Sequence, residues 1–244
     1  MSADVLASSV RDVPSLKFSD YERFSRLLLE HCGLNFSASR RTELELGIRQ
    51  AFAASTCADL DEYWCLVQEP VSGRMDLERL INAATVNETH FFRDAAQFDA
   101  LHQHVLPELI ERKRAMRTLR IWSAGCASGE EPYSIAMLLR DLLPDVDDWA
   151  VTILGTDINT EALDRAHKAV YGEWAFREDR AKQWRLRYFR PHSFKATGSS
   201  RYELLPQVQR MVSFARLNLA EPRYPAYETN TTLMDLILCR NVTI

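Results

Sequence analysis

The pattern of apolar and polar positions divides the chain into a helical first part and a second part that mixes strands with helices. From Ser19 to Ala84, apolar residues recur three or four positions apart, the spacing of amphipathic helices, and no strand-like run interrupts them. The first helix is indicated by a capping box at Ser19 and Glu22 and a stop at Gly33, and the second by an apolar face from about Ser39 to Ala53. The third is indicated by a capping box at Asp59 and Glu62, and the fourth by an apolar face at Leu77, Leu80 and Ile81. This predicts a small all-helical domain over residues 19–86, after a flexible N-terminus over residues 1–18.

Apolar runs that are typical of buried strands occur in the second part. They lie at residues 119–122, 151–157, 211–217 and 233–239. Strands that alternate with helical segments predict an α/β fold with a parallel sheet. We therefore expect a Rossmann-like sheet domain over residues 119–244, with a small β insertion at about 190–210 around a turn at Gly198. Residues 87–118 are expected to form a linker and a connecting helix.

The first strand is followed by a small-residue loop and then a helix, an arrangement that binds nucleotides at the edge of open parallel sheets. Gly125 and Gly129 let a ligand approach the backbone, and Pro132 suits the first helical position, where its missing N–H costs nothing. The loop has neither P-loop spacing nor a strict G-x-G-x-x-G, which disfavours phosphate and dinucleotide ligands. Glu130 and Glu131 would repel phosphate but suit an ammonium group, which points to S-adenosylmethionine. The alternative is that both glutamates only complement the helix dipole.

Polar residues also follow the second and fourth expected strands. Asp157 ends the second strand, where a carboxylate can accept hydrogen bonds from ribose hydroxyls. The alternative is a capping or turn role, but Asn159 can cap the next helix, so we favour the ribose role for Asp157. Arg240 and Asn241 follow the fourth strand, at the edge where open α/β sheets bind ligands.

The segment from Asn87 to Asp94 (NETHFFRD) alternates polar, small and aromatic residues too densely for an ordinary linker. The alternative is a connector whose paired phenylalanines plug the two domains together and whose Asp94 caps the next helix. His90 and the pair His102 and His104 lack the further ligands that a metal ion needs, so we expect no metal site.

Composition excludes several classes of protein. A formal net charge of −4 and a pI near 5.9 disfavour a general nucleic-acid binder. The five cysteines show neither CxxC spacing nor a disulfide framework pattern. Their simplest interpretation is as reduced thiols of a cytosolic protein. The first residues contain no signal-peptide core, and no apolar run reaches transmembrane length. We expect a soluble cytoplasmic protein without membrane insertion.

Five motifs occur in order along the chain: NETHFFRD, IWSAGCASGEEPYSIAMLL, GTDIN, the segment Arg216–Leu219, and DLILCRNV. Together they resemble the CheR family of chemotaxis-receptor glutamate methyltransferases over most of residues 19–244. The resemblance implies an S-adenosylmethionine-dependent O-methyltransferase that forms S-adenosylhomocysteine and methylates glutamate side chains of chemoreceptor signalling helices. It also implies a helical domain that contacts the receptor, a class I methyltransferase sheet and an inserted β subdomain.

The resemblance also implies roles for residues that match the family's motifs. The cofactor and acceptor pocket would be lined by Asn87, Thr89 and Arg93, and the site would be closed by Arg240 and Asn241. The cofactor loop would include Gly125, and Glu131 would face the methionine end of the cofactor. The ribose would face Asp157, and the adenine would face Asn218 and Leu219. We expect Arg93 to be the catalytic residue that holds the acceptor or cofactor carboxylate by a charge-assisted bond. A glutamate acceptor is already ionised at neutral pH, so positioning is required and a general base is not.

The sequence departs from the family pattern in two places. Where the family's second helix carries several arginines, this chain has Gly47, Gln50 and Ala51, although Arg40, Arg41 and Arg49 remain. The sequence also ends at Ile244, soon after the fourth strand and without the family's next aromatic residue. We therefore expect a sheet truncated after that strand, as part of a longer protein or as a sheet that another chain completes.

Three functional hypotheses remain. The first is a receptor glutamate methyltransferase. The second is a cofactor-binding regulatory module with little turnover, because the C-terminal part of the fold is missing. The third is a nucleotide-dependent oxidoreductase, which the loop spacing and the acidic helix start disfavour. Cofactor titration separates the third from the others, and methyl transfer to a receptor fragment separates the first from the second.

Overall fold

A computed structural model of the chain describes residues 16–85, 88–192 and 200–242. The chain forms two compact units that divide between Thr85 and Val86. Among the described residues, no helix is long and apolar enough to cross a membrane. The same residues contain no cluster of three or more histidine, cysteine or acidic side chains that could hold a metal ion.

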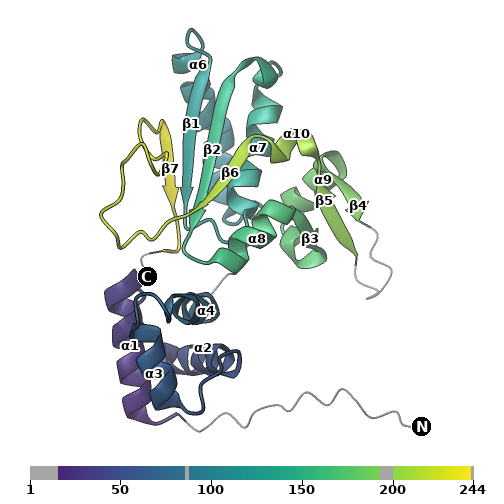
Figure 1. The fold of residues 1–244 in the computed structure, drawn as a ribbon. Coiled ribbons are helices and arrows are strands. Elements are labelled where there is room, and N and C mark those ends of the chain that lie inside the picture. Colours follow the sequence, from purple (N-terminus) through teal and green to yellow (C-terminus); the bar gives the residue numbers. More distant parts are fainter. Residues whose placement is uncertain (1–15, 86–87, 193–199, 243–244) are drawn as a thin grey trace, which may run out of the picture. The chain divides into compact units, whose positions relative to one another are not determined.

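The first unit is helical. Its elements are α1 (Phe18–Cys32), the 3₁₀ turn η1 (Ala38–Arg40), α2 (Arg41–Ala53), α3 (Leu60–Gln68) and α4 (Arg74–Ala84) (Figure 1). Each helix buries its apolar stripe in one core, where Phe24, Leu28, Leu44, Ile48, Tyr63 and Leu80 are fully buried. Gly47 lets α2 and α4 approach closely, because a Cβ there would meet the carbonyl oxygen of Ala83 at 2.9 Å.

Two of the expected helix boundaries in this unit can be compared with the observed caps. The capping box at Ser19 and Glu22 is wrong: α1 begins at Phe18, and the carboxylate of Asp20 accepts from the backbone N–H of Lys17 at 2.8 Å. The N-cap is Lys17, because the carboxylate of Asp20, three residues later, reaches back to it, so Ser19 is already the second helical residue. The cap at Asp59 is confirmed, since its carboxylate accepts from the N–H groups of the second and third helical residues.

The second unit is built on a parallel sheet. Its strands are β1 (Thr118–Ala124), β2 (Ala150–Asp157), β6 (Val212–Arg216) and β7 (Leu236–Cys239), and among the described residues their order is β6-β2-β1-β7 (Figure 1). The α/β class with a helical N-terminal part is therefore confirmed. The last strand starts at Leu236 rather than Leu233, because Leu233 has φ 55° and an exposed side chain.

The second unit contains further helical elements. They are α5 (Ala95–Ala100), the π-helical segment η2 (Leu101–Val105), α6 (Leu106–Lys113), α7 (Glu130–Leu142), the 3₁₀ turn η3 (Val146–Asp148) and α8 (Thr160–Lys168). Of these elements, α6, α7 and α8 contact the sheet. The core between helices and strands is aliphatic, with Leu119, Ile121, Ile135, Leu138 and Ile153 fully buried. Asn159 caps α8, as expected, by accepting the N–H of Ala162 at 2.8 Å.

A second, smaller sheet lies within this unit. It contains β3 (Val170–Gly172), β4 (Phe189–His192) and β5 (Arg201–Leu204), antiparallel in the order β3-β5-β4, together with η4 (Glu173–Phe176), α9 (Asp179–Tyr188) and α10 (Pro206–Gln209). The β insertion thus begins near residue 170 instead of 190. Its first strand is only three residues long and pairs with a strand thirty residues later, a relationship that local patterns do not contain. The expected turn residue Gly198 lies outside the described residues.

The segment that we expected to link the two domains belongs to the core of the second unit. Phe91 and Phe92 are completely buried there, and the ring of Phe91 stacks on that of Phe176 with centroids 5.1 Å apart. The backbone N–H of Phe91 also donates to the carbonyl of Ala175 at 3.0 Å. The paired phenylalanines therefore fix residues 88–93 against the insertion, close to the ends of the strands.

Candidate functional site

The polar positions that follow strands meet at one edge of the sheet. β1, β2 and β7 are parallel, and Ala124 and Cys239, the last residues of β1 and β7, lie in register with Thr156, the residue before the end of β2. The carboxyl ends of the strands therefore bring together the loop over residues 125–129, Asp157 and Arg240. This is the edge at which open α/β sheets bind ligands.

The loop after β1 is tightly turned. Gly125 and Gly129 have φ 74° and 90°, which favour glycine, and the N–H of Gly125 donates to the carbonyl of Thr156 at 2.8 Å. A Cβ on Gly129 would lie 3.0 Å from the ring of Phe214. α7 starts at Glu130, so Pro132 is the third helical residue and the expectation that it is the first was wrong. The two glutamates occupy the first turn, where carboxylates complement the helix dipole.

Glu131 is the carboxylate at the centre of this edge. Ser123 Oγ donates to one of its oxygens at 2.7 Å, and Arg240 Nη1 donates to the other at 3.1 Å. Its side chain is 14% exposed. Burial raises the pKa of Glu131, whereas the bond from Ser123 and the charges of Arg240 and Arg93 oppose that shift. A carboxylate has about four acceptor positions, so Glu131 can still bind a cationic ligand group.

Glu130 faces a different environment from its neighbour. Its side chain is buried, accepts from Ser128 Oγ at 2.8 Å, and has a pKa raised to about 7 by burial. Successive residues of a helix point about 100° apart, which is why one glutamate reaches the strand ends and the other turns inward. The helical pattern of the sequence does not tell the two apart, although the family resemblance singled out Glu131.

Arg240 joins three parts of the site. Besides Glu131, its guanidinium donates from Nη2 to the backbone carbonyl of Arg93 at 2.8 Å, and its Cζ lies 5.7 Å from the ring centroid of Phe98. Arg93 in turn donates from Nη1 to the carbonyl of Glu88. Arg240 therefore ties residues 88–93 to the start of α7 and to the end of β7.

The remaining residues of the expected pocket are less closely tied to this network. Thr89 is half-buried between Glu88 and His90, and Asn241 is exposed with φ 56°. Asn87 lies outside the described residues.

Asp157 has the turn role that we weighed for it, and its ribose role stays a prediction. Its Oδ2 accepts the N–H of Ala127 and its Oδ1 the N–H of Asn159, each at 2.8 Å. Burial raises the pKa of Asp157, and these backbone bonds oppose the rise. Asp157 thus holds the loop and the turn, while its half-buried carboxylate remains at the strand edge.

The segment after β6 lies next to Asp157, because the N–H of Leu217 donates to the Asp157 carbonyl at 3.0 Å. Asn218 is buried, and its Oδ1 accepts the N–H of Ala220. Leu219 packs with Leu217, Trp122 and Tyr224 in a small apolar cluster.

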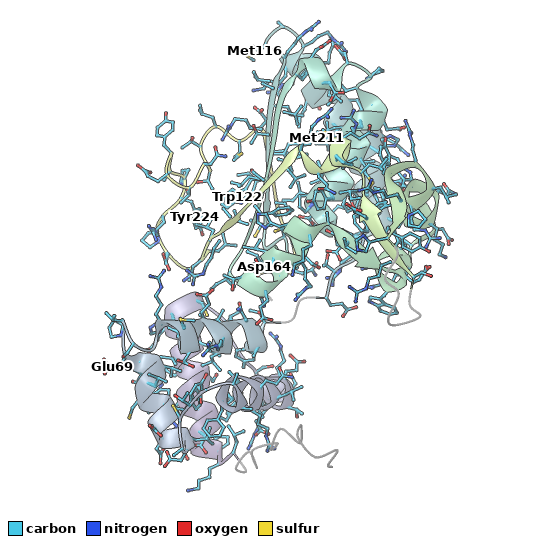
Figure 2. The ribbon with its side chains drawn as sticks, turned by 45° about the vertical axis from the view of Figure 1, so that its right-hand side comes forward. Glu69, Met116, Trp122, Asp164, Met211 and Tyr224 are labelled. Atoms are coloured by element: carbon cyan, nitrogen blue, oxygen red, sulfur yellow. The ribbon has the colours of Figure 1, made fainter. Side chains whose placement is uncertain are left out.

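Two aromatic residues of that cluster were missed by reasoning from the sequence. The rings of Trp122 and Tyr224 meet edge to face with centroids 5.5 Å apart. Figure 2 labels the two residues, which lie near each other in the second unit. The hydroxyl of Tyr224 donates to the carbonyl of Leu219, and Trp122 Nε1 donates to Thr156 Oγ1 at 2.9 Å. Nothing in the local sequence marks Tyr224, since a loop of its own brings it to the sheet. Together with Leu217 and Leu219, Trp122 and Tyr224 form an apolar cluster, and an apolar surface suits a flat ring.

Taken together, the edge combines a partly buried glutamate, an aspartate at the second strand, a glycine loop and an apolar aromatic surface. These features fit a zwitterionic nucleoside ligand: carboxylates for an ammonium group and hydroxyls, and an apolar surface for a base. An acidic helix start fits a pyrophosphate poorly.

Comparison with known proteins agrees with this chemistry. Residues 87–244 match the family model described as CheR methyltransferase, SAM binding domain. The chain is 30% identical over 228 residues to a chemotaxis protein methyltransferase of Borreliella burgdorferi, covering 92% of this chain and 77% of that protein. It is 31% identical over 226 residues to chemotaxis protein methyltransferase 2 of Vibrio cholerae, covering 93% and 75%. A probable biofilm formation methyltransferase, WspC, of Pseudomonas aeruginosa is 33% identical over 223 residues, covering 91% of this chain and 49% of that protein.

Proposed function

The chain belongs to the CheR methyltransferase family, and on this premise we propose that it transfers a methyl group from S-adenosylmethionine to glutamate carboxylates of a chemoreceptor-type signalling protein. Family membership makes the chain a methyltransferase with S-adenosylmethionine as its cofactor. The choice of acceptor and the residue roles below are our proposal. The observation that carries them is the network of Glu131, Arg240 and Arg93 at the strand edge.

We assign the cofactor contacts from the chemistry of the donors. Glu131 binds the ammonium of the methionine end, because it is a half-desolvated carboxylate with acceptor positions to spare. Asp157 accepts from the ribose hydroxyls. Asn218 and Leu219 bind the adenine beside the apolar surface of Trp122 and Tyr224.

The other assigned residues shape the site around these contacts. Gly125 allows close approach to the loop, Arg240 and Asn241 close the pocket, and Thr89 and Asn87 line its acceptor side. Arg240 acts mainly by holding Arg93, since its Nη2 donates to the Arg93 carbonyl.

The cofactor supplies an electrophilic methyl group on a positively charged sulfur. A carboxylate oxygen of the acceptor would take the methyl group and the sulfur would keep the bonding electrons, so opposite charges would disappear on the way to the products. Water stabilises the charged reactants more than the transition state, and a site that excludes water and orients both partners accelerates the step. A glutamate is ionised at neutral pH, so the chain needs no general base. Arg93 orients the acceptor carboxylate through its planar guanidinium.

The helical first unit would contact the receptor. Arg40, the last residue of η1, pairs with Glu43, and Arg41, the first residue of α2, pairs with Glu45, which reduces the charge that these arginines offer to an acidic partner. Arg49 has no ion pair among the described residues. We therefore expect Arg49 to contribute most to an electrostatic contact, and we place the reaction in the cytoplasm, where receptor signalling helices lie.

The decisive experiment measures alkali-labile methyl transfer from radiolabelled S-adenosylmethionine to a receptor signalling-domain fragment, with the fragment's acceptor glutamates replaced by alanine as control. Labelling that depends on those glutamates supports the proposal. Cofactor binding by calorimetry without any transfer would instead favour the second hypothesis, a regulatory module with little turnover. The expectation that the chain is part of a longer protein stays a prediction.

A further inference from the structure

A second guanidinium lies just beyond Arg93, at the outer end of the same network. Arg177 follows η4, and its Cζ lies 4.4 Å from the ring centroid of Trp174. Its Nη2 donates to Glu88 Oε1 at 3.1 Å. The Arg177 side chain is 25% exposed, whereas Trp174 is 68% exposed, an unusual setting for a tryptophan.

Glu88 connects this guanidinium to the proposed site. Its carboxylate pairs with Arg177, and its backbone carbonyl accepts from Arg93. Contacts therefore run without a break from Arg177 through Glu88, Arg93 and Arg240 to Glu131. The inner end of this path is the more buried, since Glu131 and Arg240 are each 14% exposed, whereas Arg177 is 25% and Glu88 59% exposed. A protein substrate is too large to enter the inner end, so it must approach from the outer end.

The hydrogen-bonding capacity of Arg177 is only partly used. Its Nη1 is buried without a hydrogen-bond partner among the described residues, and so is Nδ1 of the neighbouring His90, whose side chain is 8% exposed. Burial lowers the pKa of His90 and the charge of Arg177 lowers it further, while Glu178 opposes both. His90 therefore adds no second positive charge here. Glu88 engages only Nη2, and Nη1 is covered by the surrounding protein, so the donor that a substrate carboxylate can take over is the one that Glu88 now holds.

We propose that Arg177, stacked on Trp174, binds an acidic side chain of the protein substrate next to the methyl acceptor, and that Glu88 holds this position until the substrate replaces it. This inference rests on the proposed function. Stacking suits the role, because Trp174 covers the face of the guanidinium and leaves the in-plane Nη2 donor to a carboxylate. The exposed indole offers an apolar surface for the aliphatic stem of the bound side chain.

The competing explanation is that Arg177 and Glu88 form only a structural clamp between residues 88–93 and the insertion. The two explanations predict opposite effects for Glu88. A clamp is weakened by the loss of either partner, whereas a competitor, once removed, leaves Arg177 free for the substrate.

The first test replaces Arg177 by alanine and by lysine and measures methylation of a receptor signalling-domain fragment. We expect KM for the fragment to rise about tenfold with alanine, the effect of losing one charge-assisted contact, and to stay raised with lysine. We expect kcat and the affinity for S-adenosylmethionine to change less than about twofold. Arg185→Ala is the matched control, because Arg185 lies on the same insertion, pairs with Glu173 and stacks on Tyr202. KM should be unchanged in that variant.

The second test is Glu88→Gln, which keeps the backbone carbonyl that Arg93 uses. We expect KM for the fragment to fall about two- to threefold, as removal of a competing carboxylate predicts. For a fragment in which the acidic residues beside the acceptor are changed to glutamine, KM should be the same with wild type and with Arg177→Ala. Equal KM values for this fragment would identify the flanking carboxylate, and not the acceptor, as the group that Arg177 binds.

Unchanged KM in Arg177→Ala, or a rise of KM in Glu88→Gln equal to that in Arg177→Ala, would overturn the inference in favour of a clamp. If wild-type protein methylates no receptor fragment, the proposed function fails first. In that case calorimetric binding of the fragment decides the inference, and equal affinity of wild type and Arg177→Lys overturns it.

Discussion

Arg240 and Glu131 form an ion pair across the carboxyl edge of the sheet, with Nη1 and Oε2 3.1 Å apart and both side chains 14% exposed. The two residues are 109 positions apart in the chain, and the pair exists because β7 lies beside β1. Through Arg240, the pair holds the Glu131 carboxylate near the segment that contains Arg93.

Arg240→Ala should weaken binding of S-adenosylmethionine by about 1.5–3 kcal/mol, since it releases the Arg93 segment and removes the cation that orients Glu131. The loss of one partner of a partly buried pair should also lower the free energy of unfolding. Calorimetry and urea unfolding measure the two effects. Arg223→Ala is the control, because Arg223 is 72% exposed and pairs with Glu221 at 3.6 Å. Unchanged cofactor affinity in a folded Arg240→Ala variant would remove the pair from the site.

Asp157→Ala should lose roughly 1.5–3 kcal/mol of affinity for S-adenosylmethionine, the range for hydrogen bonds to a charged group. Because Asp157 also accepts the N–H groups of Ala127 and Asn159, the variant should be less stable as well. Asp157→Asn separates the roles, since an amide oxygen can still hold one of these N–H groups. If the asparagine variant binds the cofactor as tightly as wild type, Asp157 is a loop residue only.

Arg93→Lys should lower kcat at least about tenfold despite keeping the positive charge, because lysine cannot make the planar two-point contact with a carboxylate. The backbone bond from Arg240 does not depend on the side chain, so the fold should be retained. Methyl transfer to the receptor fragment and thermal unfolding are the measurements. Near-normal turnover would show that Arg93 acts as a simple charge or as a structural residue.

Glu130 makes the stability of the protein depend on pH. Its pKa is raised from 4.5 to about 7 by burial, so between these values the folded state holds a proton that the unfolded state has lost. Stability should therefore fall as pH rises from about 4.5 to 7 and level off above it, by roughly 3 kcal/mol in total. Glu130→Gln should remove this dependence and be more stable than wild type at pH 8.

Guanidinium unfolding at pH 5 and pH 8 tests this expectation. The exposed residue Glu111, which pairs with Arg114, provides the control variant Glu111→Gln. An equal pH dependence in wild type and Glu130→Gln would contradict it.

Gly129→Ala should destabilise the protein by about 2–3 kcal/mol, because the residue has φ 90° and its new Cβ would lie 2.9 Å from Ala166 and 3.0 Å from the ring of Phe214. Gly172→Ala is the matched control. Gly172 has φ −84°, and no described atom lies within 4 Å of a Cβ built there, so its replacement should be neutral or slightly stabilising. Equal stability of the two variants would show that the loop can relax around a side chain.

The sequence predicted much of the fold because its patterns are local. Helical periodicity in the first unit, the apolar strands and caps such as Asp59 and Asn159 each depend on residues a few positions apart. The same holds for the polar residues that end strands, since parallel strands bring their carboxyl ends to one edge. Hence Glu131, Asp157 and Arg240 could be expected together before any coordinates were known.

Tertiary structure alone decided which of these residues face the site and what else joins them. Glu131 reaches Ser123 and Arg240 while Glu130 is turned into the protein, and a helical pattern cannot distinguish two adjacent acids. The β insertion begins at Val170, and residues 88–93 pack in the core, because strand pairing and ring stacking join segments that are distant in sequence. The contact of Arg177 with Glu88 spans 89 positions for the same reason. Local propensity thus determined the elements, and long-range packing determined the chemistry at their ends.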